Sequence, residues 1–344
     1  RRGVAGGVGR AGPDFSGAVA WGAGAGSMSE QAVISWLLAG DPSIRWQVLH
    51  DLVGADEAVV ARERAMVAVD GWGARLLALQ DPSGLWGGQL YNGKWLSTTY
   101  TLLLLRRMGL EPANPQARAG CVRLLDGGFR NDGRIVYAHK DDAVDVAVTA
   151  MVLSVLAYFG CDDARVQAVA MYLVGQQLSD GRWEPYPGNP HLRYAFDTTW
   201  LALEGLWAYT RGIPAPAREV EVAQVRGREF LLRHRLWKEP SGNASIADAM
   251  ARFSLPPRWH CDVLAVLDHL QACGAYPDGR AADAIALIRA KRNPDGRWNL
   301  QNRHPGKTYF EMEEVGQPSR WNTLRALRVL RWWESPPGSG TVAA

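Results

Sequence analysis

The stretch SDGRWEP at residues 179–185 has a near copy, NPDGRWN, at 293–299 and a looser copy, DPSGLWG, at 81–87. Asp or Ser followed by Gly favours a tight turn in which the glycine adopts a positive φ. The tryptophan that follows carries a large apolar surface that a folded chain has to cover. A protein that repeats such a turn is expected to be built from similar structural units.

The spacing of the turn glycines supports this interpretation. They recur about every 50 residues, a period that is typical of a repeat architecture, here with one helical hairpin in each unit. The glycines are Gly84, Gly133, Gly181, Gly242 and Gly296.

Two kinds of helical segment alternate between these turns. A helix that is apolar nearly all round is buried on both sides, whereas a helix with one apolar face lies at the surface. The alternation therefore predicts an all-α fold, an (α/α)6 toroid with a ring of six inner helices inside a ring of six outer ones. Few runs alternate apolar and polar residues, so strands should be minor. The apolar segments are 44–53, 97–108, 145–159, 197–209, 261–270 and 322–333. The amphipathic segments are 30–39, 59–69, 116–125, 164–178, 218–234 and 281–292.

Composition limits the classes of function. With 47% hydrophobic and 21% charged residues the chain is typical of a soluble globular protein. A net charge of +3 without a basic run gives no reason to expect a nucleic-acid partner. No apolar run reaches the roughly 18 residues of a membrane span, which leaves at most peripheral membrane contact. The four cysteines lack metal-binding spacing and favour reduced thiols in a cytoplasmic protein.

The chain is expected to divide into three parts. Residues 1–28 are rich in Gly and Ala and predict a disordered extension. Residues 29–334 would form the single toroid domain, and 335–344 a flexible tail. The oligomeric state is left open by the sequence.

The repeated turns, with the helices before them, resemble the QW motifs of squalene–hopene cyclases and related triterpene cyclases. AMYLVGQQLSDGRW (170–183) and LLALQDPSGLW (76–86) carry Gln177 and Gln80 before the turn, and LIRAKRNPDGRW (287–298) has Lys291 in place of the glutamine. This resemblance, which covers roughly residues 30–334 as architecture, implies the α/α toroid that those cyclases share with protein prenyltransferase β subunits. It also implies an isoprenoid or other lipid-like substrate in a central aromatic cavity.

The chain departs from that superfamily in its chemistry. The cyclases begin their reaction at the middle aspartic acid of a DxDD motif, and the two closest stretches here place Val144 and Phe196 at that position. The prenyltransferases hold zinc through Asp, Cys and His. Here His260, Cys261 and Asp262 are consecutive, so their side chains diverge by about 100° on a helix and suit no shared ion. We therefore expect no metal and no cofactor.

Candidate catalytic groups lie where the inner helices open. Inner helices of a toroid run parallel, so their N-terminal ends meet at one mouth of the ring. Asp145, Asp197 and Asp262 either cap these helices or face a pocket in which burial and mutual repulsion raise a carboxyl pKa, and the two roles are compatible. His50 is a fourth candidate, because a histidine buried in an apolar helix needs a partner such as Asp51.

Candidate substrate-binding residues surround the same mouth. The positive ends of the helix dipoles favour an anionic group there. Three Arg–Trp dipeptides lie at or just before inner helices, and aromatic rings on these helices would line an apolar cavity. The predicted substrate-binding residues are Arg45, Trp46, Tyr100, Trp200, Arg258, Trp259, Tyr309, Arg320, Trp321 and Asn322.

Two other classes of function remain open. One is a carbohydrate-active toroid enzyme, for which Tyr309, His304 and Glu311 would supply acid–base groups. The other is a non-catalytic module that holds a partner with its mouth loops. A closed apolar cavity with two inward aspartates would favour the isoprenoid enzyme, and an open groove floored by tryptophan the carbohydrate enzyme. A ring filled by its own side chains would favour the binding module.

Overall fold

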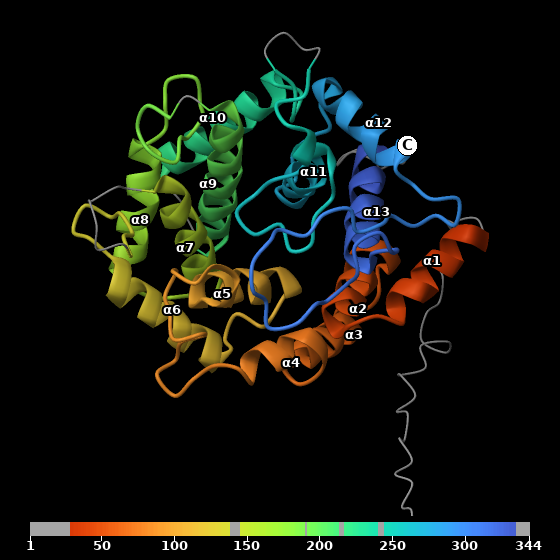
Figure 1. Ribbon diagram of the computed structural model, residues 1–344, viewed down its shortest axis with the longest axis horizontal. Coiled ribbons are helices and arrows are strands. Elements are labelled where there is room, and N and C mark those ends of the chain that lie inside the picture. The colour runs from red at the N-terminus through yellow and green to blue at the C-terminus, as the bar shows by residue number, and fades with distance from the viewer. Residues whose placement is uncertain (1–27, 138–144, 190, 213–216, 240–243, 335–344) are drawn as a thin grey trace, which may run out of the picture.

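The computed structural model describes residues 28–137, 145–189, 191–212, 217–239 and 244–334. These residues form helices arranged in two concentric rings, and the described part contains isolated β-bridges but no strand (Figure 1). The predicted all-α toroid is confirmed. The predicted extension and tail lie, apart from Met28, outside the described residues, as does Gly242. In the described segments, no helix combines the length and the apolar character needed to cross a bilayer.

The two rings follow the predicted alternation, except that residues 71–77 form an additional outer helix that the sequence did not predict. The inner ring consists of α2 (Pro42–Val48) continued by the π-helical turn η1 (Leu49–Val53), α5 (Thr98–Met108), α7 (Val146–Tyr158), α9 (Leu192–Gly212), α11 (Val263–Ala272) and α13 (Arg320–Glu334). The outer ring consists of α1 (Met28–Leu38), α3 (Glu57–Ala65), η2 (Met66–Ala68), α4 (Gly71–Leu77), α6 (Pro115–Gly128), α8 (Ala164–Gly175), α10 (Arg218–Arg233), η5 (Gly279–Ala281) and α12 (Ala282–Ala290). Two short 3₁₀ turns, η3 (Lys94–Leu96) and η4 (Asp248–Ala251), lie in connecting loops.

The difference between inner and outer helices follows from their sequences. On α7 every residue from Val146 to Leu156 is buried, and none of them is charged. On α10 the buried residues recur at helical spacing, from Val220 through Ala223 and Gly227 to Leu231, and the remaining face carries the charged residues together with exposed Val222 and Val225. A fully apolar helix thus packs on both sides, whereas α10 covers the ring with one face.

The three repeated turns are built alike. Trp86, Trp183 and Trp298 are each fully buried. The indole Nε1 of each tryptophan donates a hydrogen bond of 2.7–2.8 Å to the carbonyl ten residues earlier, in the preceding outer helix. Each backbone N–H donates to a threonine hydroxyl of the following inner helix, namely Thr98 on α5, Thr199 on α9 and Thr323 on α13. Through these two hydrogen bonds, each tryptophan connects an outer helix to the next inner helix.

The polar residue that precedes each turn differs from the prediction in one of the three copies. Gln80 and Gln177 each donate to the carbonyl of their turn glycine and to a carbonyl of the next outer helix. In the third turn the residue that reaches the glycine carbonyl is Arg292, at 3.4 Å, and not Lys291. Lys291 instead donates to Gln301. Counting back from Gly296 by the four residues that separate Gln177 from Gly181 reaches Arg292, so the predicted alignment was wrong by one residue.

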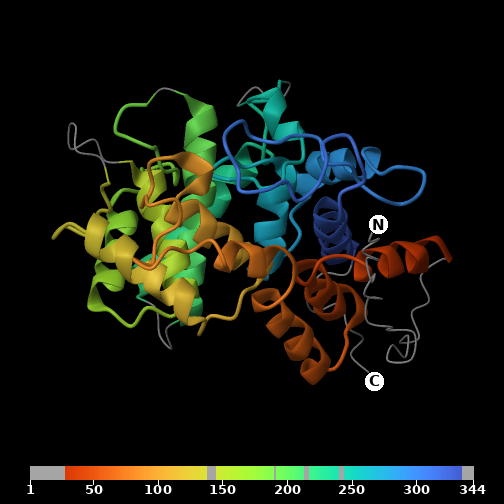
Figure 2. The same ribbon diagram turned by 60° about the horizontal axis from the view of Figure 1, so that its bottom comes forward.

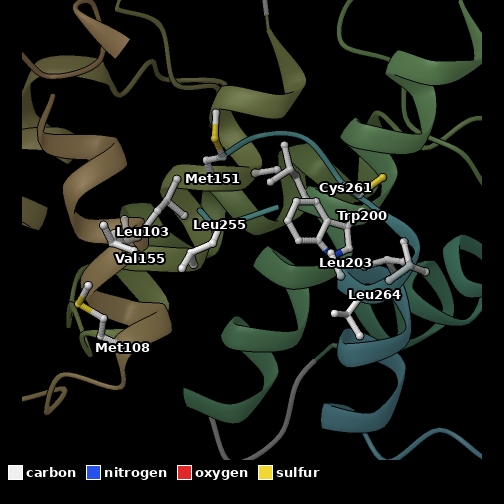
Figure 3. Close-up of a cluster of buried hydrophobic side chains, with 14 of the residues drawn as sticks. Leu103, Met108, Met151, Val155, Trp200, Leu203, Leu255, Cys261 and Leu264 are labelled. Carbon is white, nitrogen blue, oxygen red and sulfur yellow. The ribbon is translucent and has the colours of Figure 1, made fainter. Parts of the chain in front are cut away.

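The N-terminal end of the inner ring is filled. Loops at 252–262 and 299–319 cross the middle of the ring on one face (Figures 1 and 2). Leu255 on the first loop lies among Leu103, Met151 and Trp200 of three inner helices (Figure 3). Beneath these loops the voids measure about 20 and 10 Å3. A more open depression of about 790 Å3 lies at this end too, but it is lined only by residues of the 299–319 loop and by no aromatic ring. The predicted central aromatic cavity therefore does not open at this mouth.

Candidate functional site

Two of the predicted catalytic aspartates cap inner helices. Asp145 accepts a hydrogen bond of 2.9 Å from the backbone N–H of Ala147, at the start of α7. Asp262 accepts one of 2.7 Å from Ala265 on α11 and, through its other oxygen, one of 2.9 Å from Ser254. Burial raises the pKa of both carboxyls. These contacts make the two residues structural caps, and Asp262 also anchors the loop at 252–262.

Asp197 does not open a helix, contrary to the prediction, because α9 already begins at Leu192. Its Oδ1 accepts a hydrogen bond of 2.7 Å from Cys261 and lies 2.9 Å from the guanidinium of Arg193. The other oxygen lies 3.6 Å from Nδ1 of His260. Asp197 thus holds the segment before α11 against α9. Asp197 and Asp262 both lie near Cys261, whereas Asp145 lies near Tyr91.

The predicted arginines do not stack on their neighbouring tryptophans. Arg45 is buried and paired with Glu63 at 2.6 Å. Arg258, with a φ of +59°, lies over the ring of Trp95 at 4.9 Å. Arg320 lies over Trp36 at 4.6 Å. Of their neighbours, Trp321 is buried in the core and Trp259 packs on His260.

The remaining predicted residues at this mouth hold loops or fill the core. Tyr100 and Trp200 are buried. The Nδ2 atom of Asn322 donates to the carbonyls of Phe253 and Asn299, and the hydroxyl of Tyr309 donates to Leu96. For the carbohydrate alternative, His304 stacks on His260 with ring centroids 4.3 Å apart, and Glu311 pairs with Arg303 at 2.7 Å.

The wide cavity lies at the opposite end of the ring. It has a volume of about 570 Å3 and is lined by the C-terminal parts of all six inner helices. We call it the C-terminal cavity. Of the predicted site residues, it is lined by His50 and Trp46. Its other side chains that carry charge, hydrogen-bonding groups or rings are Gln47, Asp51, Arg64, Arg106, Arg107, Tyr158, Glu204, Trp207, Arg211, Asp268, His269, Gln271 and Arg328.

One carboxylate of the cavity joins two arginines. Glu204 on α9 accepts hydrogen bonds of 2.9 Å from Arg106 and 2.8 Å from Arg107, both on α5. Burial opposes the ionisation of Glu204, but the two guanidinium groups outweigh it and lower its pKa to about 2. Glu204 is therefore a fixed anion at neutral pH and does not serve as a proton donor.

A second ion-pair network crosses from α11 to η1. Asp268 accepts from Arg325 at 3.1 Å and from two nitrogens of Arg328 at 2.5 and 2.7 Å. Arg328 also donates to Asp51 at 3.0 Å and to Gln47 at 2.9 Å. Burial disfavours the charge on Asp268, yet the two arginines hold the pKa of its carboxyl below the ordinary value. The network ties three inner helices together at the cavity floor.

The cavity also holds groups that these networks leave available. His269 is 3% exposed, and its Nε2 has no hydrogen-bond partner within the described part of the chain. Burial lowers the pKa of this imidazole to about 4, so it is neutral at pH 7. At the walls Arg64 lies over the ring of Trp46 at 5.1 Å and Arg211 over Trp207 at 5.4 Å. A ligand would meet charge and aromatic surface together.

His50 lies at the rim of the cavity and is not buried, contrary to the prediction. Its side chain is 65% exposed. Nδ1 lies 2.6 Å from Oδ1 of Asp51, the predicted partner. This hydrogen bond raises the pKa of His50. Both residues lie on η1, and π-helical turns often occur at functional sites.

The sequence interpretation missed most residues of the cavity. The signal was present, since each inner segment except 145–159 carries charge in its C-terminal half, as in the pair Asp268–His269 within AVLDHL. A charge inside an apolar helix requires a partner from a neighbouring helix. Over the described residues, no three His, Cys, Asp or Glu side chains group closely enough to hold a metal ion.

Among solved structures the chain is similar to a protein from Actinoplanes, with 20% identity over 86% of this chain and 90% of that one and a TM-score of 0.44. It is also similar to the apo type II terpene cyclase MstE from Scytonema, with 16% identity over 88% and 96% of the two chains and a TM-score of 0.44. A variant of that cyclase in complex with geranylgeranyl dihydroxybenzoate matches at 17% identity over 88% and 95%, again with a TM-score of 0.44. No protein-family model and no curated protein matches the chain. These similarities assign it to no family.

Proposed function

We propose that this protein binds a small organic anion with an apolar body in the C-terminal cavity. An isoprenoid or other lipid-like phosphate or carboxylate is the ligand class that suits this cavity best. Five arginines line it against three carboxylates, and this excess of positive charge carries the proposal. Neither Arg64 nor Arg211 is bound to Glu204 or Asp268. Arg64 already donates to Gly109 and Tyr158 and lies 3.5 Å from Glu111, so Arg211 is the arginine best suited to meet an anionic head group.

The walls supply the apolar part of the ligand's surroundings. Trp46, Tyr158 and Trp207 line the cavity together with several alanines. The volume of about 570 Å3 lies within the roughly 300–1,000 Å3 that is usual for small-molecule sites. The neutral imidazole of His269 offers one further hydrogen bond to a ligand.

Glycoside hydrolysis receives no support from this geometry. It requires one carboxyl group that is protonated near neutral pH and a second that is ionised. The carboxylates of the C-terminal cavity are ion-paired, and the pKa of Glu204 is about 2. At the other mouth, Tyr309, His304 and Glu311 have packing partners of their own. Binding without catalysis stays compatible with the site.

Isothermal titration calorimetry with three probes tests the proposal. Geranyl phosphate should bind, whereas geraniol and inorganic phosphate should bind at least tenfold more weakly, since each lacks one half of the recognised chemistry. Arg211→Gln should weaken geranyl phosphate about tenfold, as expected for the loss of one charged contact. Arg289→Gln, which removes an exposed arginine paired with Glu334, is the matched control and should have no effect. Equal binding of geraniol and geranyl phosphate would contradict the proposal.

A further inference from the structure

We infer that His50 is the proton-transfer residue of the C-terminal cavity, with Asp51 and Arg328 as the residues that position it. This inference rests on the proposed function, because it assigns a reaction step to the ligand that the cavity binds. It is carried by the geometry at the rim, where an accessible imidazole is joined to a buried chain of charged groups.

The first step concerns the tautomer of His50. Burial works against the ionisation of Asp51, but hydrogen bonds with His50 and Arg328 hold the pKa of its carboxyl below the usual value. An ionised carboxylate accepts hydrogen bonds only, so the proton between the two side chains belongs to Nδ1 of His50. The other ring nitrogen, Nε2, is therefore the one that exchanges protons.

The second step concerns the position of Asp51. Its Oδ2 accepts a hydrogen bond of 3.0 Å from Arg328 while its Oδ1 holds His50. Arg328 is in turn fixed by two hydrogen bonds to Asp268 on α11. The carboxylate is thus held from both sides, and it orients the imidazole as the third member of a catalytic triad orients its base.

The third step concerns the surroundings of His50. Asp51 on the same turn raises its pKa, whereas Arg64 from α3 and Arg328 from α13 lower it. Arg331 of α13 also approaches η1, through a hydrogen bond to the carbonyl of Leu52. The hydrogen bond with Asp51 is the largest influence, so the pKa of His50 is raised from its ordinary value. Such a group is suited to general acid–base catalysis.

The proposed transfer needs no additional reactant. The Nε2–H bond of the imidazolium breaks, its electron pair stays on Nε2, and the proton forms an O–H bond with an oxygen of the bound phosphate or carboxylate. Asp51 stays ionised and keeps the Nδ1 proton in place. In the reverse direction, neutral Nε2 takes a proton from the ligand and Asp51 stabilises the resulting imidazolium.

The first test measures proton exchange on binding. Geranyl phosphate is titrated into the full chain at pH 6 to 8 in buffers of different ionisation enthalpy. His50→Gln, which can keep a hydrogen bond to Asp51, should exchange fewer protons per bound geranyl phosphate than the wild type. Geranyl phosphate itself titrates in this range. The contribution of His50 is therefore the difference in the number of protons exchanged between the wild type and His50→Gln. Equal exchange in both would overturn the inference, and the exposed His191→Gln is the control.

The second test uses the ligand-free protein and stays decisive if geranyl phosphate does not bind. Nitrogen-15 NMR of the histidine rings should show neutral His50 with its proton on Nδ1. Asp51→Asn should lower the His50 pKa and shift the pH of half-protonation downward, a change that a purely structural role would not produce. A proton on Nε2, or an unchanged titration in Asp51→Asn, would overturn the inference. Absence of binding combined with the expected tautomer would count against the proposed function alone.

Discussion

Arg106 on α5 and Glu204 on α9 are joined by a 2.9 Å hydrogen bond, although 98 residues separate them in the sequence. Helix α7 packs against both α5 and α9, so this bond links two inner helices that flank a third. Arg107 donates to the same carboxylate oxygen at 2.8 Å. The C-terminal end of the ring thus holds a cavity lined by charged side chains, whereas the N-terminal end is filled by apolar side chains.

The first prediction concerns Glu204→Gln. The carboxylate is 8% exposed, and its removal leaves two arginines without their shared partner, which should cost about 3 kcal/mol of unfolding free energy at pH 7. The folded-state pKa of about 2 lies below the ordinary 4.5. The stabilisation is therefore complete above pH 4.5 and is lost as the pH falls towards 2.

Urea unfolding from pH 7 to pH 2.5 measures this difference. The difference in unfolding free energy between wild type and Glu204→Gln should be constant near neutral pH and should become smaller below pH 4.5. Glu221→Gln, an exposed change on α10, serves as the control and should leave stability unchanged within about 0.5 kcal/mol. A gap that does not narrow in acid would show that Glu204 is not ionised by its arginines.

The second prediction concerns the buried histidine of the cavity. Burial lowers the pKa of His269 to about 4, so the unfolded chain binds more protons than the folded one between pH 6.5 and pH 4. Stability should accordingly fall by about 3 kcal/mol as the pH decreases through this window. His269→Gln should remove that fall, whereas His191→Gln at the surface should keep it. The measurement is urea unfolding at half-unit steps of pH.

The ring architecture could be predicted from the sequence because it depends on average properties of whole segments. The stretch 145–159 is apolar on all sides and becomes α7, while 218–234 is apolar on one side and becomes α10. The boundaries were close, but α9 begins at Leu192 and not at Asp197, because Arg193 and Tyr194 continue the helix before the apolar run. That difference moved Asp197 from a helix opening to the interior of a helix.

The site was harder to predict because it depends on which helices face each other. Sequence reasoning sought function at the helix openings, where polar residues are conspicuous. It could not foresee that Leu255 would fill that mouth, because its loop reaches the ring centre only in three dimensions. The charges inside inner helices, such as Arg328 and Asp268, were visible in the sequence. Their pairing across α13 and α11 was not.

The third prediction concerns the glycines that face the turn tryptophans. A Cβ added at Gly227 on α10 would lie 2.7 Å from Cζ3 of Trp183, and one added at Gly120 on α6 would lie 2.9 Å from Cζ3 of Trp86. Gly227→Ala and Gly120→Ala should each destabilise the protein by about 1–3 kcal/mol, since a fully buried indole has little room to move.

The matched control for these changes is Gly175→Ala at the end of α8, where a Cβ meets nothing within 4 Å. Its stability should stay the same or rise by up to about 0.5 kcal/mol. Thermal unfolding followed by circular dichroism distinguishes the three variants. If Gly227→Ala were as stable as Gly175→Ala, the indole of Trp183 would not be tightly packed against α10.

The fourth prediction separates structure from function at the N-terminal mouth. Asp197 is 1% exposed and holds both Arg193 and the backbone of Cys261, so Asp197→Asn loses a charged interaction but keeps a backbone one. Its unfolding free energy should fall by about 2 kcal/mol. Binding of geranyl phosphate in the C-terminal cavity should remain within about twofold, because no atom of Asp197 lines that cavity.

The exposed Asp56→Asn, whose side chain makes no capping bond, is the control and should change neither the unfolding free energy nor the affinity. Asp197→Asn with unchanged stability and abolished binding would instead place the functional centre among the helix openings. Calorimetry and urea unfolding of the same samples distinguish a structural from a functional role of Asp197. Substitution of a residue that supports the fold mainly lowers the unfolding free energy, whereas substitution of a residue that contacts the ligand mainly lowers the affinity.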